Sequence, residues 1–245
     1  MSIRDKVAIV TGGGRGIGAA TALLLAREGA RVVIASRTVE EIEATAREIA
    51  AESGRDRVLA VPTDVAEEAA VVALFDRTLE RFGDVHVLVN DAGVFAGGEF
   101  ADFPLPTWER VQAVNVRGTF LASRELFRRV RERGHGGAIV QVSSLGGVQG
   151  TEKFPGFAAY TTSKYAVIGL TETLAVEGRA LGIRVNCVAP GAVDTRMLRE
   201  AAPFLHASTT VDDVARVIRD LADDEVSAGL TGALFTIDDG VTIRR

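Results

Sequence analysis

Two side chains that could transfer a proton lie four positions apart in the sequence. Tyr160 and Lys164 fall in a segment with helical periodicity, so they are expected to share one helix face. A phenol is a poor base at neutral pH unless a neighbouring positive charge stabilises its phenolate. A lysine ammonium supplies such a charge, and the pair could then act as acid and base on a carbonyl or an alcohol. Taken alone, the same pair could also be an ordinary surface contact.

A glycine-rich segment follows the first β-branched run of the chain. It reads Thr11-Gly12-Gly13-Gly14-Arg15-Gly16-Ile17-Gly18 and opens an alanine- and leucine-rich helix. Glycines allow a tight turn and a close approach of the backbone to a diphosphate, and a helix N-terminus offers unpaired N–H groups. The strict G-x-G-x-x-G pattern is absent, and T-G-x-x-x-G-x-G stands in its place. The segment predicts a nucleotide site, with a plain tight turn as the alternative.

The end of the second β-branched run bears on the identity of the nucleotide. An NAD site usually carries an Asp or Glu about 20 residues beyond the glycines, where it binds the ribose 2′-hydroxyl. Here the run ends Ala35-Ser36-Arg37-Thr38, with no carboxylate, and Arg15 lies in the glycine segment. Two guanidinium groups suit a 2′-phosphate. We therefore expect NADP(H) in preference to NAD(H); the alternative is that both arginines are merely solvated.

Seven short apolar runs alternate with helical patterns along the chain. Nearly continuous apolar runs are typical of strands buried on both faces of a parallel sheet. The alternation predicts an α/β fold, a Rossmann-type doubly wound parallel sheet of about seven strands flanked by helices, whereas a closed barrel needs eight units. The expected strands are Val7–Val10, Arg31–Ala35, Val58–Val61, Val85–Val89, Ala138–Val142, Ile183–Val188 and Leu234–Ile237. The expected helices run from the glycine segment to Glu28 and over Val39–Ser53, Glu67–Phe82, Thr107–Arg133 with a break at Gly118, Ala159–Leu181 and Val211–Ala222.

The composition indicates one soluble globular domain over residues 1–245, with 47% apolar and 25% charged residues. A net charge of −5 gives no basic footprint for nucleic acid or for an anionic membrane. The sequence shows no secretory signal and no apolar run of membrane-spanning length. The single cysteine, Cys187, permits no intrachain disulfide and is expected in the core. We expect a cytoplasmic protein that binds neither nucleic acid nor membrane.

These motifs, in this order, resemble those of the short-chain dehydrogenase/reductase (SDR) family over nearly the whole chain. The resemblance adds Asp64-Val65, Asn90-Asp91-Ala92-Gly93, Pro190-Gly191 and Thr195 to the motifs above. It implies that the catalytic residues are Asn115, Ser144, Tyr160 and Lys164. It also implies cofactor contacts at Gly12, Arg15, Gly16, Ile17, Gly18, Ser36, Arg37, Asp64, Val65, Asn90, Ala92, Gly93, Tyr160, Lys164, Pro190, Gly191, Val193 and Thr195.

The resemblance assigns a role to each catalytic residue. Tyr160 would be the acid in reduction and the base in oxidation, and Lys164 would bond the nicotinamide ribose. Ser144 would donate to the substrate oxygen, and Asn115 would position a water that passes protons to the lysine. Ser143 competes with Ser144, because neighbouring residues of a strand face opposite ways, and the family register favours Ser144. The implied activity is NADP(H)-dependent interconversion of a ketone or aldehyde with an alcohol, by a carbonyl reductase or alcohol dehydrogenase that forms a homotetramer or homodimer.

Four departures from the family pattern leave the substrate open. Asp91 replaces the second asparagine of its motif, and Asp239 interrupts an Asp-Gly-Gly near the C-terminus. Ser144 and Tyr160 are separated by a few more residues than usual, and the expected substrate lid, about residues 196–210, is short.

Two other functions remain as alternatives. The first is a 3-oxoacyl-acyl-carrier-protein reductase, which would need basic residues to dock an acidic carrier. It is weakly favoured by the arginines at 128, 129, 131 and 133, although Leu181 and His135 stand where such reductases often carry arginine. The second is a non-catalytic nucleotide-binding regulator, which the intact set of catalytic residues argues against.

The remaining candidate residues have simpler interpretations. His86 and His206 have no partners at metal-ligand spacing, so no catalytic metal is expected, and His135 is expected in a solvated loop. Several apolar residues flank the expected crevice and could line a site for a hydrophobic carbonyl compound or belong to the core: Phe154, Phe157, Phe204 and Leu205.

Overall fold

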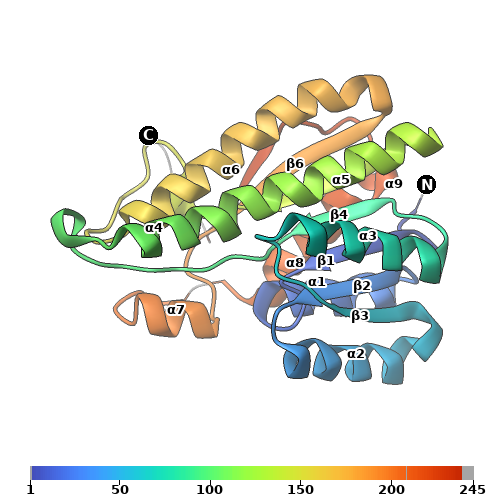
Figure 1. Ribbon diagram of the computed structural model, residues 1–245, viewed down its shortest axis with the longest axis horizontal. Helices are drawn as coiled ribbons and strands as arrows, with labels where there is room; N and C mark the ends of the chain where they lie inside the picture. The colour runs from blue at the N-terminus through green and yellow to red at the C-terminus, as the bar shows by residue number, and fades with distance from the viewer. Residues whose placement is uncertain (1, 208, 239–245) are drawn as a thin grey trace.

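The computed structural model describes residues 2–207 and 209–238, and its centre is one parallel sheet (Figure 1). The strands are β1 (Val7–Thr11), β2 (Arg31–Ser36), β3 (Val58–Pro62), β4 (Val87–Asn90), β5 (Gly137–Val142), β6 (Ile183–Pro190) and β7 (Leu234–Ile237). They lie in the order β3-β2-β1-β4-β5-β6-β7, and every neighbouring pair is parallel. This confirms the predicted doubly wound α/β sheet. Because the order reverses between β1 and β4, a binding crevice is expected at their carboxyl ends.

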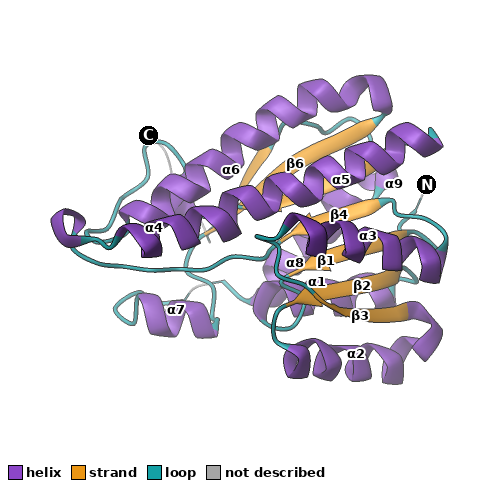
Figure 2. Ribbon diagram, in the orientation of Figure 1, coloured by secondary structure: helices purple, strands orange, loops and turns teal. Residues whose placement is uncertain are grey.

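Helices cover both faces of the sheet (Figure 2). They are α1 (Gly16–Arg27), α2 (Val39–Ser53), α3 (Glu68–Phe82), α4 (Leu105–Gln112), α5 (Gly118–Arg133), α6 (Ala158–Glu177), α7 (Arg196–Ala201), α8 (Val211–Ala222) and α9 (Asp224–Ser227). The apolar faces of α1, α2 and α8 pack on one side of the sheet, and those of α3, α5 and α6 pack on the other. No helix in the described part of the chain combines the length and apolar character needed to cross a membrane.

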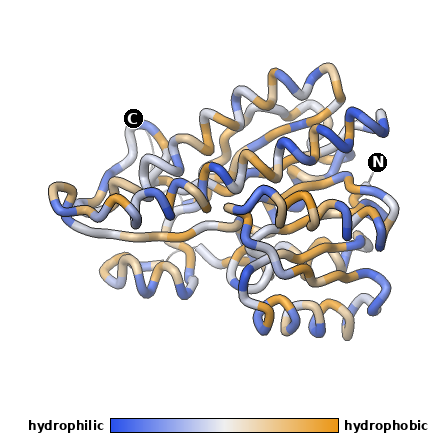
Figure 3. The backbone as a smooth tube through the Cα atoms, in the orientation of Figure 1, coloured by the Kyte–Doolittle hydropathy of each residue, from blue (hydrophilic) through white to orange (hydrophobic). Residues whose placement is uncertain are grey.

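Strand β1 shows why the strands are apolar at successive positions. Ala8 and Val10 pack in the cluster beneath α1, α2 and α8, whereas Val7 and Ile9 pack in the cluster beneath α3, α5 and α6. Neighbouring side chains of a strand point to opposite faces, and both faces are covered here. Figure 3 shows the same contrast, with hydrophobic colour along the strands and alternating colour along α2. Each fully buried Val or Ile side chain stabilises the fold by about 1.5–3 kcal/mol.

The segment between β4 and β5 differs in detail from the sequence prediction. The helix begins at Leu105 rather than Thr107, and its irregularity is a π-helical turn over Ala113–Arg117 rather than a break at Gly118. The helix continues through Gly118, and glycine fits there because an added Cβ would lie 2.7 Å from Cγ2 of Val65.

The segment expected to form the substrate lid contains the short helix α7, which sequence periodicity did not reveal. In Figure 1, α4 and α7 both lie beyond the carboxyl ends of the strands. Residue 208 of this segment lies outside the described residues, as do Asp239 and the rest of 239–245.

Candidate active site

A cavity of about 1380 Å³ opens at the carboxyl edge of the sheet. Its walls come from the glycine segment, the ends of β2 and β5, the segments that follow β3, β4 and β6, and helix α6. Most of the predicted site residues line it: Gly12, Arg15, Gly16, Ile17, Ser36, Arg37, Asp64, Val65, Ala92, Gly93, Ser144, Tyr160, Lys164, Pro190, Gly191, Val193 and Thr195. Three do not lie on its wall, namely Gly18, Asn90 and Asn115.

The glycine segment is shaped for close approach to an anion. Gly12 has φ +73°, and a Cβ added there would lie 2.9 Å from the backbone nitrogen of Ala92. Arg15 is the N-cap of α1 and makes no capping hydrogen bond through its side chain, and the first turn contains no acidic residue. Gly16 and Ile17 of that turn line the cavity. An uncapped helix N-terminus beside a glycine turn fits the diphosphate of a dinucleotide.

Gly18 supports the glycine turn from behind instead of lining the cavity. A Cβ at this position would lie 2.4 Å from the carbonyl oxygen of Gly12, so only glycine fits. Its backbone N–H donates a hydrogen bond to the carboxylate of Asp91. Glycine is therefore required at position 18 by close packing against the turn.

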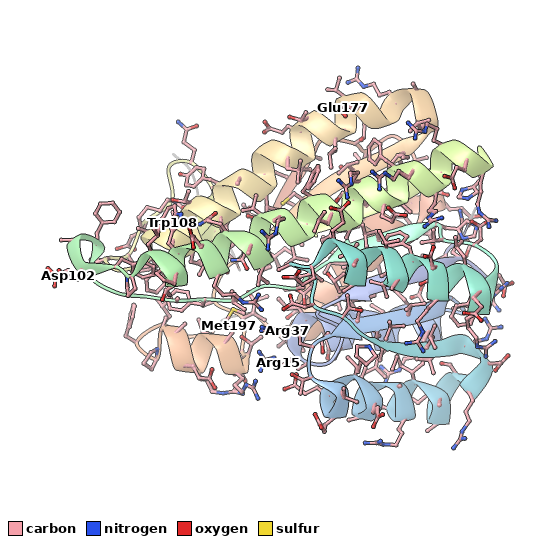
Figure 4. The ribbon with its side chains drawn as sticks, viewed as in Figure 1. Arg15, Arg37, Asp102, Trp108, Glu177 and Met197 are labelled. Atoms are coloured by element: carbon pink, nitrogen blue, oxygen red, sulfur yellow. The ribbon has the colours of Figure 1, made fainter. Side chains whose placement is uncertain are left out.

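Arg15 and Arg37 are both exposed and lie at the opening of the cavity, where Figure 4 labels them close to Met197 of α7. Arg15 Nη1 lies 3.6 Å from Glu41 Oε1, a partner that the sequence did not indicate. Arg37 makes no ion pair within 4.0 Å with any residue that the structure describes. Arg37 is therefore a cation at this opening that has no carboxylate in direct contact among the described residues.

Asp64 lies at the same end of the cavity, after β3. Its Oδ1 accepts the N–H of Ala66 at 3.0 Å, and its Oδ2 lies 3.1 Å from Arg110 Nη2. Burial acts to raise the pKa of this carboxyl, but the two hydrogen bonds and the charges of Arg110 and Arg37 outweigh it, so the pKa is lowered. The carboxylate is thus held ionised in a fixed orientation.

The three groups expected to perform the chemistry converge on one wall. Lys164 is buried, its Nζ donates to the carbonyl oxygen of Val142 at 2.9 Å, and this Nζ lies 5.6 Å from the centroid of the Tyr160 ring. Tyr160 and Ser144 are half-buried and line the same cavity. A phenol, an ammonium and a hydroxyl at one site can move a proton to or from a substrate oxygen.

The two adjacent serines at the end of β5 have different contacts. Ser143 is buried, and its hydroxyl donates to the backbone carbonyl of Lys164 at 2.8 Å, which ties β5 to α6. Ser144 accepts a hydrogen bond from the N–H of Gly146 at 3.2 Å and donates none to a described residue. The hydroxyl available as a donor to a ligand is therefore that of Ser144.

Asn115 and Asn90 lie behind the wall of the cavity, and their side chains bond to neighbouring segments of the chain. Asn115, in the π-helical turn, accepts the N–H of Val94 at 2.8 Å and donates to Val94 O at 3.0 Å and Ser163 Oγ at 2.9 Å. Both donors of its amide and one acceptor position thus fasten the segment after β4 to α6. Asn90 donates to Gln141 Oε1 at 2.9 Å and to a serine hydroxyl of α5, so it braces β4 against β5.

Asp91, the departure from the asparagine pattern, does line the cavity. Burial raises the pKa of its carboxyl to about 7, although the charge of Lys164 and the N–H of Gly18 act to lower it. An asparagine amide at this position would not titrate. The aspartate found here therefore places a group that can bind a proton beside the glycine turn.

One side of the cavity is walled by aromatic rings. The ring of Phe95 lies 5.4 Å from that of Tyr160 and 4.6 Å from that of Phe157. Phe154 in turn lies 5.7 Å from both Phe157 and Phe204. Phe95 was missed by the sequence analysis, although its position two residues after the Asn90–Gly93 motif is a signal that could have revealed it. The wall offers apolar surface directly beside the phenol.

A second cluster of titratable groups lies at the opposite edge of the sheet. His135 Nε2 is 2.9 Å from Asp84 Oδ1, and His86 Nε2 is 3.7 Å from Asp84 Oδ2. Sequence spacing could not reveal these contacts of His86 and His135, because the two histidines are far apart in the sequence; His135 itself is exposed, as a loop residue is expected to be. His86 Nδ1 accepts the N–H of Val7, and His135 Nδ1 contacts the carbonyl oxygen of Gly136, so both rings are also bonded to backbone.

The arginine run at the end of α5 lies away from the cavity. The carboxyl end of α5 leads into the amino end of β5, which is the opposite edge of the sheet. Arg129 lies 2.7 Å from Glu125 and 2.8 Å from Asp76, and Arg128 lies 3.3 Å from Glu125. The run lies on a helix surface, where Arg128 and Arg129 are ion-paired, and it gives no support to docking at the site.

Comparisons with known proteins identify relatives over the whole length of the chain. The family model for short chain dehydrogenases matches residues 6–205. A 3-alpha-(or 20-beta)-hydroxysteroid dehydrogenase of Mycobacterium tuberculosis is 38% identical over 240 residues, which cover 96% of this chain and 88% of that protein. A short-chain type dehydrogenase/reductase from Mycobacterium marinum has a TM-score of 0.93 at 30% identity and covers 99% of this chain and 98% of its own. A 3-ketoacyl-(acyl-carrier-protein) reductase from Brucella melitensis, solved with NADH, has a TM-score of 0.89 at 32% identity and covers 99% of this chain and 100% of its own.

Proposed function

Because this chain belongs to the short-chain dehydrogenase family of oxidoreductases, we propose that it interconverts a ketone or aldehyde with an alcohol, using NADP(H). The observation that carries the proposal is the convergence of Tyr160, Lys164 and Ser144 on one cavity wall, beside the uncapped N-terminus of α1. A regulator without turnover would not need a phenol, an ammonium and a hydroxyl together at that point.

Tyr160, Lys164 and Ser144 have different roles in the proposed reaction. The nicotinamide supplies or accepts the hydride when it is bound. In reduction Tyr160 gives its phenolic proton to the substrate oxygen, and in oxidation it takes that proton back. Lys164, held by the carbonyl oxygen of Val142, places its positive charge near the phenol and stabilises the phenolate. Ser144 donates a hydrogen bond to the substrate oxygen as negative charge develops there.

Asn115 acts in this scheme through its neighbours. Its amide fastens Val94, on the wall, to Ser163, one residue before the lysine. It therefore fixes the segment after β4 against α6. This contact holds Tyr160 and Lys164 in place relative to the glycine segment.

The preference for NADP(H) is supported by the cations at the opening of the cavity. Arg37 has no carboxylate partner in direct contact, and no acidic residue ends β2, so a 2′-phosphate would find a free guanidinium there. Arg15 would have to exchange its contact with Glu41 for the phosphate. The Brucella reductase was solved with NADH, so this similarity does not favour NADP(H). The proposed preference therefore depends on the arginines of this chain.

The aromatic wall supports an apolar carbonyl compound as substrate. Phe95, Phe154 and Phe157 line the cavity next to Tyr160, and the wall carries no charge of its own. Binding pockets for apolar ligands are built in this way, with few polar groups at the reacting atoms. A steroid alcohol, the class in the name of the mycobacterial relative, would suit such a wall.

The direct test is a panel of ketones and aldehydes followed by the loss of NADPH absorbance, with the corresponding alcohols and NADP⁺ as the reverse panel. We expect turnover with apolar ketones and little with charged ones of equal size. Binding of NADPH without turnover on any carbonyl or alcohol in either direction would contradict the proposed activity and favour a regulator.

A 3-oxoacyl-acyl-carrier-protein reductase is the second candidate. The observation in its favour is that two cations, Lys153 and Arg199, line the cavity and could meet an acidic carrier at its mouth. Lys153 is committed to Val148 O at 2.7 Å, and Arg199 forms an ion pair with Asp194. A titration with acidic carrier protein that showed no saturable binding would remove this candidate.

Self-association into a dimer or tetramer belongs to the same proposal. It is supported by two large apolar side chains of long helices, Phe120 on α5 and Val176 on α6, which leave 43% and 61% of their surface exposed where a second subunit could cover them. Light scattering of the purified protein would give the mass of the assembly, and a monomer at all concentrations would contradict it.

A further inference from the structure

Asp91 lies between the glycine segment, residues 11–18, and helix α6, which carries Tyr160 and Lys164. It follows β4 and lines the cavity. Its carboxylate accepts the N–H of Gly18 in the first turns of α1, and a Cβ added to Gly18 would lie 2.8 Å from Asp91 Oδ2. On the other side, a Cβ added to Gly12 would lie 3.1 Å from the backbone carbon of Asp91. The carboxyl group is thus pressed against the turn that would receive the diphosphate.

The charges around this carboxyl come from few groups. Lys164 on α6 is the cation that acts on it, and Tyr160 of the same helix shares the cavity wall. In the glycine segment Arg15 is the charged residue, and the first turn of α1 has no acidic residue. Burial outweighs the lysine and the Gly18 N–H, so the pKa of Asp91 is raised to about 7. Near neutral pH the group can therefore be neutral or ionised.

We propose that Asp91 couples binding of the dinucleotide to the uptake of one proton. The inference rests on the proposed NADP(H) cofactor. A diphosphate at the N-terminus of α1 would bring negative charge close to the carboxyl, which disfavours its ionised form. The neutral carboxyl keeps one oxygen that can accept the N–H of Gly18, so the turn retains its support when the proton is bound. Asp91 is in this sense a positioning residue whose charge sets the affinity for the cofactor.

A measurable pH dependence follows from this coupling. Where free Asp91 is ionised, binding must take up a proton, so the dissociation constant should rise by up to about tenfold for each pH unit above about 7. Asp91→Asn has the same shape, keeps an acceptor for Gly18 and cannot titrate. Its dissociation constant should change by less than about threefold over the same range, and at high pH it should bind more tightly than the natural chain.

The test is a series of NADPH titrations, read by nicotinamide fluorescence, from about pH 6.5 to about pH 8.5 on the natural chain and on Asp91→Asn. The 2′-phosphate itself titrates near pH 6, so the same series with NADH separates its contribution. His206 also lines the cavity and is exposed, and His206→Gln serves as the matched control, which should keep the slope of the natural chain. Calorimetry in two buffers of different ionisation enthalpy then counts the protons taken up.

A steep slope and proton uptake in the natural chain, both lost in Asp91→Asn, would support the inference. The same slope in both proteins, or proton uptake that persists in Asp91→Asn, would overturn it while leaving the cofactor intact. If neither protein bound NADPH or NADH at any pH, the proposed function itself would fail, and the inference with it.

Discussion

Removal of the Arg37 side chain should separate the two nicotinamide cofactors. Arg37 lies exposed at the opening of the cavity and makes no ion pair within 4.0 Å with a described residue, so a 2′-phosphate competes for it with the more distant charge of Asp64 and with no carboxylate in direct contact. A hydrogen bond to a charged group contributes about 1.5–3 kcal/mol, and exposure reduces that value. We expect Arg37→Ala to weaken NADPH binding by about 0.8–1.6 kcal/mol, which is about 4- to 15-fold in Kd.

The second arginine provides a graded comparison. Arg15 already contacts Glu41 at 3.6 Å, so a phosphate gains less from it, and Arg15→Ala should weaken NADPH binding by about 3- to 10-fold. NADH has no 2′-phosphate, and its Kd should change by less than about twofold in either variant. Arg47→Ala, an exposed arginine of α2 that does not line the cavity, is the matched control for loss of one surface charge.

The assay is fluorescence titration of both reduced cofactors at one ionic strength, because salt screens exposed charges. The reasoning is refuted if NADH binds the natural chain as tightly as NADPH and Arg37→Ala changes neither constant. An equal loss for both cofactors would show that Arg37 contacts the shared part of the dinucleotide.

Two further changes test how the site is held and how the fold responds to acid. Gly147→Ala would place a Cβ 2.5 Å from the backbone carbon of Lys164, so it should displace α6. The melting temperature should fall, and turnover should decrease by at least about tenfold. Unchanged activity would contradict the close packing of this loop. Burial lowers the pKa of His86, and Asp84 also has a lowered pKa, because the Val85 N–H and the charges of His135 and His86 outweigh its burial. Groups with depressed values in the folded state contribute stability that is present at higher pH and is lost as the pH falls, for His86 below about 6.5 and for Asp84 below about 3.9. Asp91, whose pKa is raised to about 7, contributes the opposite trend over the same range, so the test compares the two proteins. The natural chain should lose more stability relative to His86→Asn as the pH falls from about 7 to about 5; an identical profile in the variant would refute the assignment.

The fold could be predicted from the sequence because local patterns were enough to define its elements. Each β-branched run became a strand, since the helices that follow cover both of its faces. The limits of prediction were local as well. Strand β4 begins at Val87 rather than Val85, because the N–H of Val85 bonds to the side chain of Asp84 at 2.8 Å and the ladder with β1 starts at Ala8 opposite Val87. The helix α7 has only six residues, too few for periodicity to indicate.

The sequence allowed prediction of the site residues that directly follow a strand, because each strand end can be recognised locally. The sequence indicated which residues follow each strand, and the shared edge of a parallel sheet then brought most of them to one cavity. Contacts between distant segments could not be predicted in this way. The pairing of Arg15 with Glu41, the contact of Phe95 with the Tyr160 ring and the position of Asn115 behind the wall all depend on tertiary packing.

The central claim, that Tyr160 moves the proton while the cofactor is held by other residues, is tested most directly by measuring turnover and NADPH affinity together in Tyr160→Phe. Loss of the hydroxyl alone should reduce turnover by about 10²- to 10⁴-fold and leave the Kd for NADPH within about threefold. Tyr165→Phe, on the same helix with its side chain exposed, should retain full turnover. Undiminished turnover in Tyr160→Phe would contradict the account.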